Sequence, residues 1–216
     1  MALNDTGRQL TESTARRYFA DVLSTRRARG GPARPLFVTS SHLAASYPEL
    51  SGFEFGLIVA WHAFERWMLR CMGAATGGKR ELAPIDVLVL HHVHHRLSPK
   101  RIADLCFVLN IEDAHVVSYS LKKLVAAGLV RGEKRGKEVF FSTSPAGADL
   151  CRRYKQVRDD CLVSGFDREP GEADRLASIA QFLRGQAGAY DQASRTAAVS
   201  LGGSGAVTAK RRGRRR

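Results

Sequence analysis

Apolar residues recur at helical spacing through the middle of the chain. From Phe53 to about Ala75 the large apolar side chains form one broad stripe, made of Phe53, Leu57, Trp61, Phe64, Met68 and Cys71. Spacings of three and four residues place such side chains on one face of a helix. Glycine and polar clusters, such as TGGKREL after this segment, interrupt the pattern. The chain is therefore predicted to be mainly α-helical.

Four shorter elements follow in quick succession. APIDVLVLHHVHH predicts a helix that opens with Pro84, and SPKRIADLCFVLN predicts a second with Ser98 as its N-cap. EDAHVVSYSLKKLVAAG predicts a third, ending at Gly128 where a left-handed cap is expected. LVRGEKRGKEVFFSTS reads as two short strands around a charged turn that contains Gly136. Helical patterns then resume, so the β structure is confined to one hairpin.

The third helix has two distinct faces. A turn at Asn110-Ile111 joins it to the preceding helix, and its apolar face carries Val117, Leu121 and Leu124. The opposite face carries hydrogen-bonding and cationic side chains: His115, Ser118, Tyr119 and Lys122. A helix packed by its apolar stripe would present these groups to a partner, which is what a reader of the DNA major groove requires.

Positive charge is concentrated in two places. The formal net charge is +13, and the last seventeen residues contain six basic and no acidic residues. Between His115 and Val139 there are six basic and two acidic residues, although the rest of the range 53–199 is balanced. Excess cationic charge favours polyanionic partners, nucleic acid first. A charged ribbon beside a helix-turn-helix is typical of a winged helix, whose wing reaches the DNA backbone or the minor groove.

The segment Ile102 to Gly147 resembles the MarR family of winged-helix transcription regulators. The similarity is carried by IADLCFVLNIEDAHVVSYSLKKLVAAGLVRGEKRGKEVFFSTSPAG, including L-x-x-L-x-x-x-G-L-V and the T-x-x-x-G exit from the wing. The wing lacks the Asp-x-Arg signature usual in that family, and Arg135 and Lys137 are the candidates to replace its arginine. The resemblance implies a homodimer, with the Phe53–Cys71 stripe and a helix over 169–199 as dimerisation elements.

The predicted organisation follows from these observations. Residues 53–199 would form a MarR-like winged-helix domain with flanking N- and C-terminal dimerisation helices, and the DNA-binding core would occupy about 82–147. Residues 1–52 would be an extension with one helix and an irregular linker, and 200–216 a disordered basic tail that follows phosphates. The candidate DNA-binding residues are Ser98, Lys100, His115, Ser118, Tyr119, Lys122, Lys123, Arg131, Lys134, Arg135 and Lys137.

The run HHVHHR offers weak metal-ligand candidates. His91 and His95 are four residues apart, and His92 and His95 are three apart, so a helix could present such pairs to one ion. No cysteine lies at a ligand spacing and no H-E-x-x-H pattern is present. A proton-sensing role is also open. The preferred interpretation is a helix edge at the surface or at the dimer, with no metal and no cofactor.

Other chemistry finds little support. The chain has no phosphate-binding glycine loop and no nucleophile elbow, so an enzyme is not expected. Trp61, Phe64 and Trp67 could line an effector pocket, although aromatics at helical spacing more often serve core or dimer packing. The four cysteines form no Cys-x-x-Cys pair and read as free thiols in a reducing compartment. The apolar stretch FGLIVAWHAF is far shorter than the roughly 20 residues that span a membrane.

The sequence as a whole predicts a cytoplasmic, nucleoid-associated transcription regulator. It would bind double-stranded DNA sequence-specifically as a homodimer and respond to a small-molecule effector. Two alternatives remain open: a non-specific architectural nucleic-acid-binding protein that uses the basic tail, and a metal-responsive regulator that uses the His91–His95 cluster.

Overall fold

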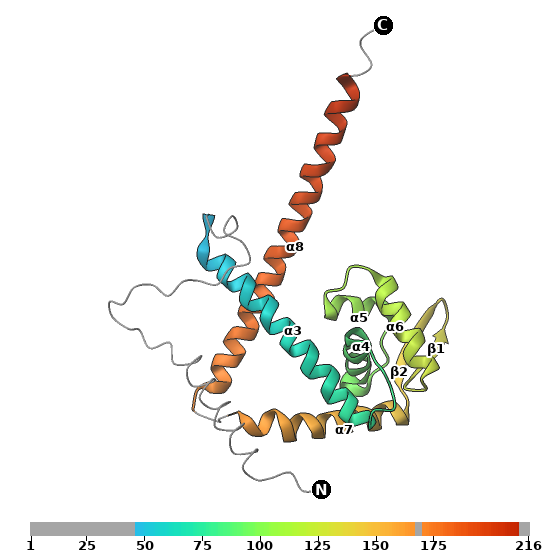
Figure 1. Cartoon of the computed structure of the whole chain (residues 1–216). Coiled ribbons are helices and arrows are strands. Elements are labelled where there is room, and N and C mark those ends of the chain that lie inside the picture. The colour runs from blue at the N-terminus through green and yellow to red at the C-terminus, as the bar shows by residue number, and fades with distance from the viewer. Residues whose placement is uncertain (1–45, 167–169, 212–216) are drawn as a thin grey trace, which may run out of the picture. The chain divides into compact units, whose positions relative to one another are not determined.

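Helices and a single hairpin make up the described chain, as the sequence predicts (Figure 1). The structure is a computed structural model that describes residues 46–166 and 170–211, with side chains as far as residue 200. The described residues fall into two compact units, one that ends at residue 66 and one that begins at residue 67. The helix predicted over TESTARRYFADVLSTRR lies outside the described residues. None of the described helices has both the length and the apolar composition needed to cross a lipid bilayer.

Helix α3 spans Pro48–Thr76 and begins before the predicted start at Phe53. The segment Pro48 to Gly52 was expected to be an irregular linker, but proline is well suited to the first turn of a helix because it needs no backbone donor there. Gly77 and Gly78 end α3 with positive φ values of 64° and 73°. Their amide groups donate to the carbonyls of Ala74 and Gly73, at 3.1 and 2.9 Å, and so close the helix end.

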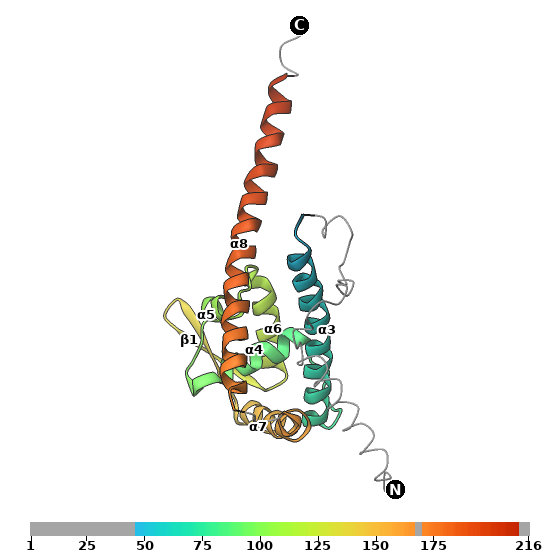
Figure 2. The same cartoon turned by 90° about the vertical axis from the view of Figure 1, so that its left-hand side faces the viewer.

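Three helices follow and pack against one another, as the two views in Figure 1 and Figure 2 show. They are α4 (Pro84–His94), α5 (Ile102–Leu109) and α6 (Ala114–Ala126). A short 3₁₀ turn, His95–Leu97, separates α4 from α5. Asn110 joins α5 to α6 in the left-handed conformation, with φ 52° and ψ 46°, which confirms the predicted turn. Asparagine tolerates this conformation better than other non-glycine residues.

The predicted start of α5 is wrong. Ser98 was expected to cap this helix, but Arg101 is the N-cap, and the Asp104 side chain accepts the Arg101 backbone N–H at 2.9 Å. The residues between Ser98 and Arg101 are extended, because Lys100 pairs with Phe141 of the hairpin through two backbone hydrogen bonds of 2.8 Å. A cross-strand pairing that is distant in sequence therefore overrides the local Ser-Pro signal for a helix start.

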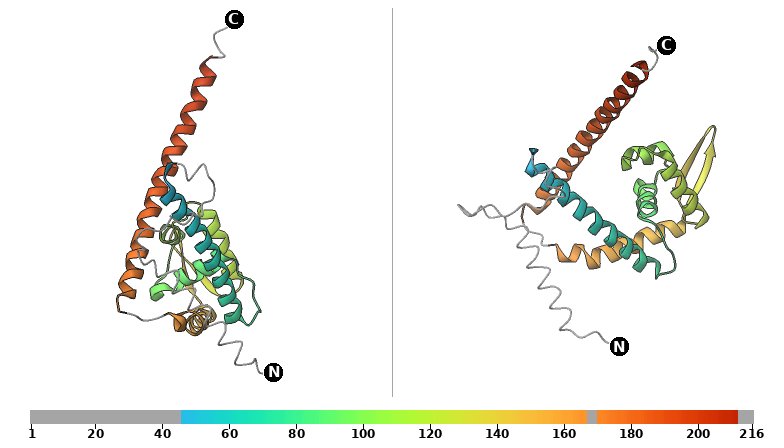
Figure 3. Two further views of the ribbon diagram at one scale, coloured as in Figure 1. Left: turned by 60° about the vertical axis from the view of Figure 1, so that its left-hand side comes forward. Right: turned by 45° about the horizontal axis from the view of Figure 1, so that its top comes forward.

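The hairpin consists of β1 (Val130–Arg135) and β2 (Glu138–Thr143), paired antiparallel with Val130 opposite Thr143 and Arg135 opposite Glu138. It projects from the helices as a narrow ribbon (Figure 3). Gly136 forms its turn with a φ of 63°, in agreement with the sequence pattern. Helix α7 (Pro145–Cys161) follows, and its N-cap Ser144 accepts the Gly147 backbone N–H at 3.0 Å.

One hydrophobic core joins these elements inside the second unit. It combines the end of α3 with α4, α6 and α7, and its most buried large members are Met68, Met72, Leu90, Leu121, Leu124 and Leu150. A 3₁₀ turn, Val163–Gly165, follows α7. Because the core includes residues from both sides of the hairpin, it fixes where the hairpin leaves the helices.

Helix α8 spans Glu172–Arg211, whereas the sequence predicts a disordered tail from residue 200. The segment LGGSGAVTAK has few helix-favouring residues beyond its alanines, but extending an existing helix requires no new nucleus. Residues 212–216 lie outside the described part. The division of the chain at residues 52 and 199 stays a prediction.

Candidate nucleic-acid interface

Helix α6 has the two faces that the sequence predicts. Val117, Leu121 and Leu124 are at most 1% exposed and face the core. On the other side His115 and Lys122 are exposed, Tyr119 is 74% exposed, and Ser118 is partly buried. Asp113 caps the helix by accepting the His115 backbone N–H at 2.8 Å. A rigid helix therefore presents a cationic and hydrogen-bonding surface.

The C-terminal end of α6 is held from two directions. Gly128 adopts the left-handed conformation predicted for it, with a φ of 72°, and its N–H donates to the Val125 carbonyl at 2.9 Å. The Arg80 guanidinium, from the segment between α3 and α4, donates to the Ala127 carbonyl at 2.5 Å. Arg80 was not identified from the sequence, because nothing local to it indicates a partner so far along the chain.

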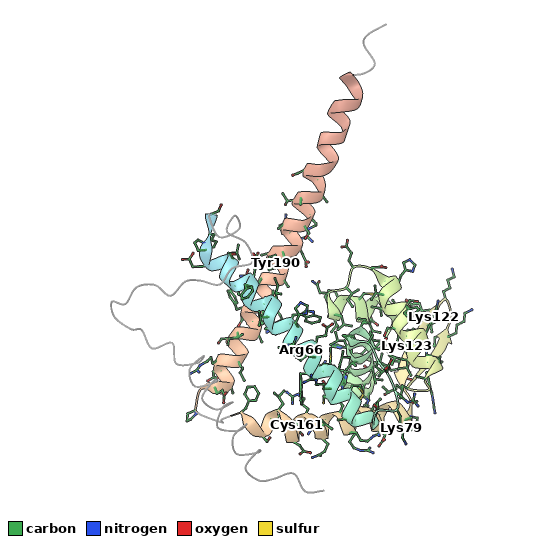
Figure 4. All side chains as sticks on the ribbon, in the orientation of Figure 1. Arg66, Lys79, Lys122, Lys123, Cys161 and Tyr190 are labelled. Atoms are coloured by element: carbon green, nitrogen blue, oxygen red, sulfur yellow. The ribbon has the colours of Figure 1, made fainter. Side chains whose placement is uncertain are left out.

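Lys123 was predicted to contact DNA, but the structure engages it in an ion pair. Its ammonium lies 2.7 Å from a carboxylate oxygen of Asp86, whose side chain is only 2% exposed. The same oxygen accepts the Ala83 backbone N–H at 2.8 Å and so caps α4. Lys122 lies on the outer side of α6 and Lys123 on the side nearer α4 (Figure 4). Lys123 thus ties α6 to α4, and Lys122 faces outward.

Ser98 and Lys100 interact with each other. The Lys100 ammonium donates to the Ser98 carbonyl at 2.7 Å, to the Ser98 hydroxyl, and to the His95 carbonyl at 3.1 Å. These bonds close the turn between α4 and α5. The two predicted DNA contacts therefore lie side by side at one loop, and the lysine already has three acceptors there.

The hairpin carries three outward cations and one paired cation. Arg135 lies 2.8 Å from a carboxylate oxygen of Glu133 and 5.2 Å above the centroid of the Phe140 ring. Across residues 46–166 and 170–200, no ion pair engages the other three predicted cations, which are Arg131, Lys134 and Lys137. These three can reach the phosphate backbone without breaking an existing ion pair.

An ion pair also joins the hairpin to the start of α5. The Arg101 guanidinium lies 3.0 Å from Asp104 in its own first turn and 3.0 Å from Glu138 at the start of β2. Hydrogen bonds from Arg101 hold the pKa of the Asp104 carboxyl below its usual range. Arg101 and Glu138 were missed from the sequence because neither has a local partner that marks it.

The structure does not bring the candidate histidine ligands together. Helix α4 ends at His94, and His95 has extended backbone angles of −61° and 128°, so His91 and His95 do not form a pair on one helical face. The His91 and His92 Nδ1 atoms each lie 2.8 Å from a backbone carbonyl, that of Val87 and that of Leu88 respectively. No group of three His, Cys, Asp or Glu side chains able to hold a metal occurs in the described part of the chain.

His91 is instead a partly buried residue that packs against α7. Its Nε2 is buried without a hydrogen-bond partner among the described residues, and its ring meets the Tyr154 ring edge-on at 4.4 Å. Burial lowers the pKa of His91, and the hydrogen bond to the Val87 carbonyl offsets part of this effect. The neutral ring therefore packs between α4 and α7.

This environment predicts a pH-dependent stability. The folded-state pKa of His91 lies below the unfolded value of about 6.5, so the unfolded chain takes up the proton first. The free energy of unfolding should be highest above that value and fall on acidification, by at most about 1.4 kcal/mol per pH unit from this residue. Urea denaturation at several pH values gives the free energy of unfolding of wild type, of His91→Phe and of the exposed control His95→Gln. Only His91→Phe should show a weaker dependence of that free energy on pH. Equal slopes for all three would refute the assignment.

The aromatic trio does not form a described cavity. The Trp61 and Phe64 rings are 6.4 Å apart and about half exposed, and Trp67 packs against the hydrophobic core. A cleft described near the end of α3 is lined by other residues. An effector pocket at these three aromatics stays a prediction.

The comparisons with known proteins agree with this geometry. The family of winged helix DNA-binding domains matches residues 82–147, the range that contains α4, α5, α6 and the hairpin. Residues 82–147 therefore have the winged-helix fold and match the winged helix DNA-binding family. No curated protein matches the chain in sequence.

Solved structures extend the similarity beyond the winged helix domain. AbfR of Staphylococcus epidermidis is similar with a TM-score of 0.53 at 13% identity, over 64% of this chain and 93% of its own. A MarR transcriptional regulator from Methanosarcina mazei Go1 is similar with a TM-score of 0.50 at 14% identity, over 62% and 89%. At these identities the similarity concerns the fold, which confirms the MarR-like architecture expected from the sequence.

Proposed function

We propose that this chain is a transcription regulator that binds double-stranded DNA sequence-specifically as a homodimer. The observation that carries the proposal is the exposed face of α6, set beside a cationic wing within a winged helix DNA-binding domain. Helices of this kind enter the major groove, and wings contact the backbone or the minor groove. The protein would then be a non-enzymatic one that acts on cytoplasmic, nucleoid DNA.

The side chains divide into two roles under this proposal. On α6, Tyr119 and Lys122 would contact base edges or thymine methyl groups, with His115 and Ser118 beside them. On the wing, Arg131, Lys134 and Lys137 would hold phosphates, and Arg135 would have to leave Glu133 to do so. Lys123, and Lys100 with Ser98, would support the site because their polar groups are already engaged.

The main test of this assignment is a single substitution on the outward face. Lys122→Ala should lower affinity for a selected operator about tenfold or more, because each good base contact contributes roughly 1–3 kcal/mol of discrimination. Affinity for random duplex should fall much less, and fluorescence anisotropy measures both. Lys155→Ala, an exposed lysine on α7 paired with Asp159, is the control and should bind as wild type does. An equal loss on both duplexes would make Lys122 a phosphate contact, and unchanged binding would remove α6 from the interface.

The homodimer is proposed from apolar faces that each unit leaves exposed. In α3 these are Leu57, Trp61 and Phe64, and in α8 they are Leu176, Ile179 and Phe182. Large apolar surfaces of this kind usually mark protein contacts. Sedimentation equilibrium should give twice the chain mass for the wild type and a lower mass for the double variant Trp61→Glu, Phe182→Glu. A monomeric wild type at micromolar concentration would contradict this part of the proposal.

A further inference from the structure

Before Arg66, which is labelled in Figure 4, helix α3 carries exposed apolar side chains on two sides. One side, which the proposed homodimer would cover, carries Leu57, Trp61 and Phe64. Ile58 and Val59 do not lie on that side, because each helical residue turns the chain by about 100°. They are 45% and 52% exposed. An apolar surface therefore remains on α3 after the proposed dimer contact is made.

This second face of α3 consists of five residues. Positions i, i+4, i+7, i+8 and i+11 share one side of a helix, and here they are Ser51, Phe55, Ile58, Val59 and His62. Phe55 is partly buried and His62 is exposed. The second face thus has an apolar centre, with a hydroxyl at one end and an imidazole at the other.

The hydroxyl at the start of the second face is buried. Ser51 is only 2% exposed, and its Oγ has no hydrogen-bond partner among the described residues. Its backbone N–H donates to the Tyr47 carbonyl at 3.3 Å. A buried hydroxyl without a partner costs free energy, and such groups are rare in folded proteins. Its position beside exposed apolar side chains indicates that a further segment lies against this face.

The chain itself contains a segment that fits the second face. Residues 11–27 lie outside the described part, and in their sequence apolar side chains recur at i, i+3, i+4, i+7 and i+8: Ala15, Tyr18, Phe19, Val22 and Leu23. This spacing predicts an amphipathic helix, and a helix of this length is marginal in water unless its apolar stripe is covered.

The connecting chain is long enough for this contact. Residues 28–45 can span up to about 60 Å when extended. Ile58 lies only about 18 Å along α3 from residue 46, because an α-helix rises 1.5 Å per residue. The segment can therefore reach the whole of the second face without strain in the connection.

Charge also favours this pairing. Residues 46–65 contain three glutamates and no lysine or arginine, whereas residues 11–27 contain four arginines, one aspartate and one glutamate. Glu54 and Glu65 border the second face by their positions in the helix. Exposed ion pairs contribute little stability, but complementary charges of this kind help to fix which surfaces meet and in which orientation.

We propose that residues 11–27 form a helix that packs on the second face of α3 in the same chain. Phe19 and Val22, at the centre of the apolar stripe, would lie against Ile58 and Val59. Polar side chains of the segment would give the buried hydroxyl its missing partner. The contact would cover apolar surface that otherwise favours further association of dimers. It does not involve DNA, so it can fail while the proposed function holds, and the reverse.

Hydrogen–deuterium exchange of the full chain, measured by mass spectrometry on peptides from residues 11–27, tests this contact. In the wild type these amides should exchange about tenfold or more slowly than in an unstructured chain, because a packed helix must open before it exchanges. The double variants Ile58→Gln, Val59→Gln and Phe19→Gln, Val22→Gln should each restore the unstructured rate to within about twofold. Glutamine is a good helix former, so neither pair of changes removes helix propensity.

Phe107→Gln is the matched control, because Phe107 of α5 is 87% exposed and offers a rival apolar surface. It should leave the exchange of residues 11–27 unchanged, and the amides of α6 should stay protected in every variant. If the change on α3 unfolds α6, the variant in the segment decides. Exchange at the unstructured rate in the wild type overturns the proposal, as does protection that survives either double variant. Loss of protection in Phe107→Gln also overturns it, because the segment would then lie on α5.

Discussion

Replacing Gly147 with alanine is expected to lower the free energy of unfolding by about 3 kcal/mol, one of the two largest effects in this chain. Gly147 is buried in the first turn of α7, just after the wing. A Cβ atom there would lie 2.0 Å from the Leu129 carbonyl oxygen and 3.0 Å from its carbonyl carbon. Neither atom can move away easily, because the same oxygen accepts the Ser144 backbone N–H at 3.0 Å.

Urea denaturation of wild type and Gly147→Ala measures this effect directly. Gly185→Ala is the control, since Gly185 is also helical but has nothing within 4 Å of its Cβ position. That change should be neutral or should stabilise by up to about 1 kcal/mol, because alanine favours a helix over glycine. If the two variants prove equally stable, the close contact between α7 and the start of the wing is not present.

Replacing Asp86 with alanine is expected to destabilise the fold by about 3 kcal/mol. Its buried carboxylate accepts the Ala83 N–H and the Lys123 ammonium through one oxygen. The substitution therefore removes both the side chain that caps α4 and the ion pair that joins α4 to α6. The exposed Lys123 ammonium can return to water, since that side chain is 42% exposed, and this limits the loss.

A double-mutant cycle separates the ion pair from the cap. Lys123→Ala leaves the buried Asp86 carboxylate without its cation, so the two single variants and the double variant should show a coupling of about 1–2 kcal/mol. Asp104→Ala is the matched control, because Asp104 caps α5 in the same way but is exposed, and its loss should be about 1 kcal/mol. If the changes in the free energy of unfolding of the two single variants add up to that of the double variant, Asp86 and Lys123 act independently.

The sequence is most informative where a local pattern decides the structure. The spacing of Val117, Leu121 and Leu124 predicts the buried face of α6, and the same spacing places Tyr119 and Lys122 on the outer face. Gly128 and Gly136 are predicted correctly because positive φ values favour glycine at a helix end and in a hairpin turn. Helix order, turn and hairpin are therefore all accessible from residue types alone.

Contacts between distant segments account for the errors. The local Ser-Pro pattern favours a helix start at Ser98, but pairing of Lys100 with Phe141 keeps those residues extended. Lys123 has the charge of a DNA contact and a position next to Lys122, and only the location of Asp86 on α4 shows its other role. A sequence alone does not give the distance between residues 37 positions apart.

The candidate site shows the same division. Residue types and charge indicate a nucleic-acid surface and a wing, and the family resemblance adds the exit from the wing at Gly147. Neither indicates the bond from Arg80 to the end of α6 or the ion pair of Arg101 with Glu138. These support contacts lie at ordinary surface positions, where charged residues are common and need no partner.

The central claim is that the winged helix domain reads DNA sequence, and one measurement tests it most directly. Fluorescence anisotropy would compare the full chain with a chain ending at residue 199, on duplexes from the region upstream of its own gene and on shuffled controls. The shortened chain should still prefer one upstream duplex by on the order of a thousandfold at physiological salt. Equal binding of all duplexes, lost when residues 200–216 are removed, would contradict the claim and favour a non-specific architectural protein.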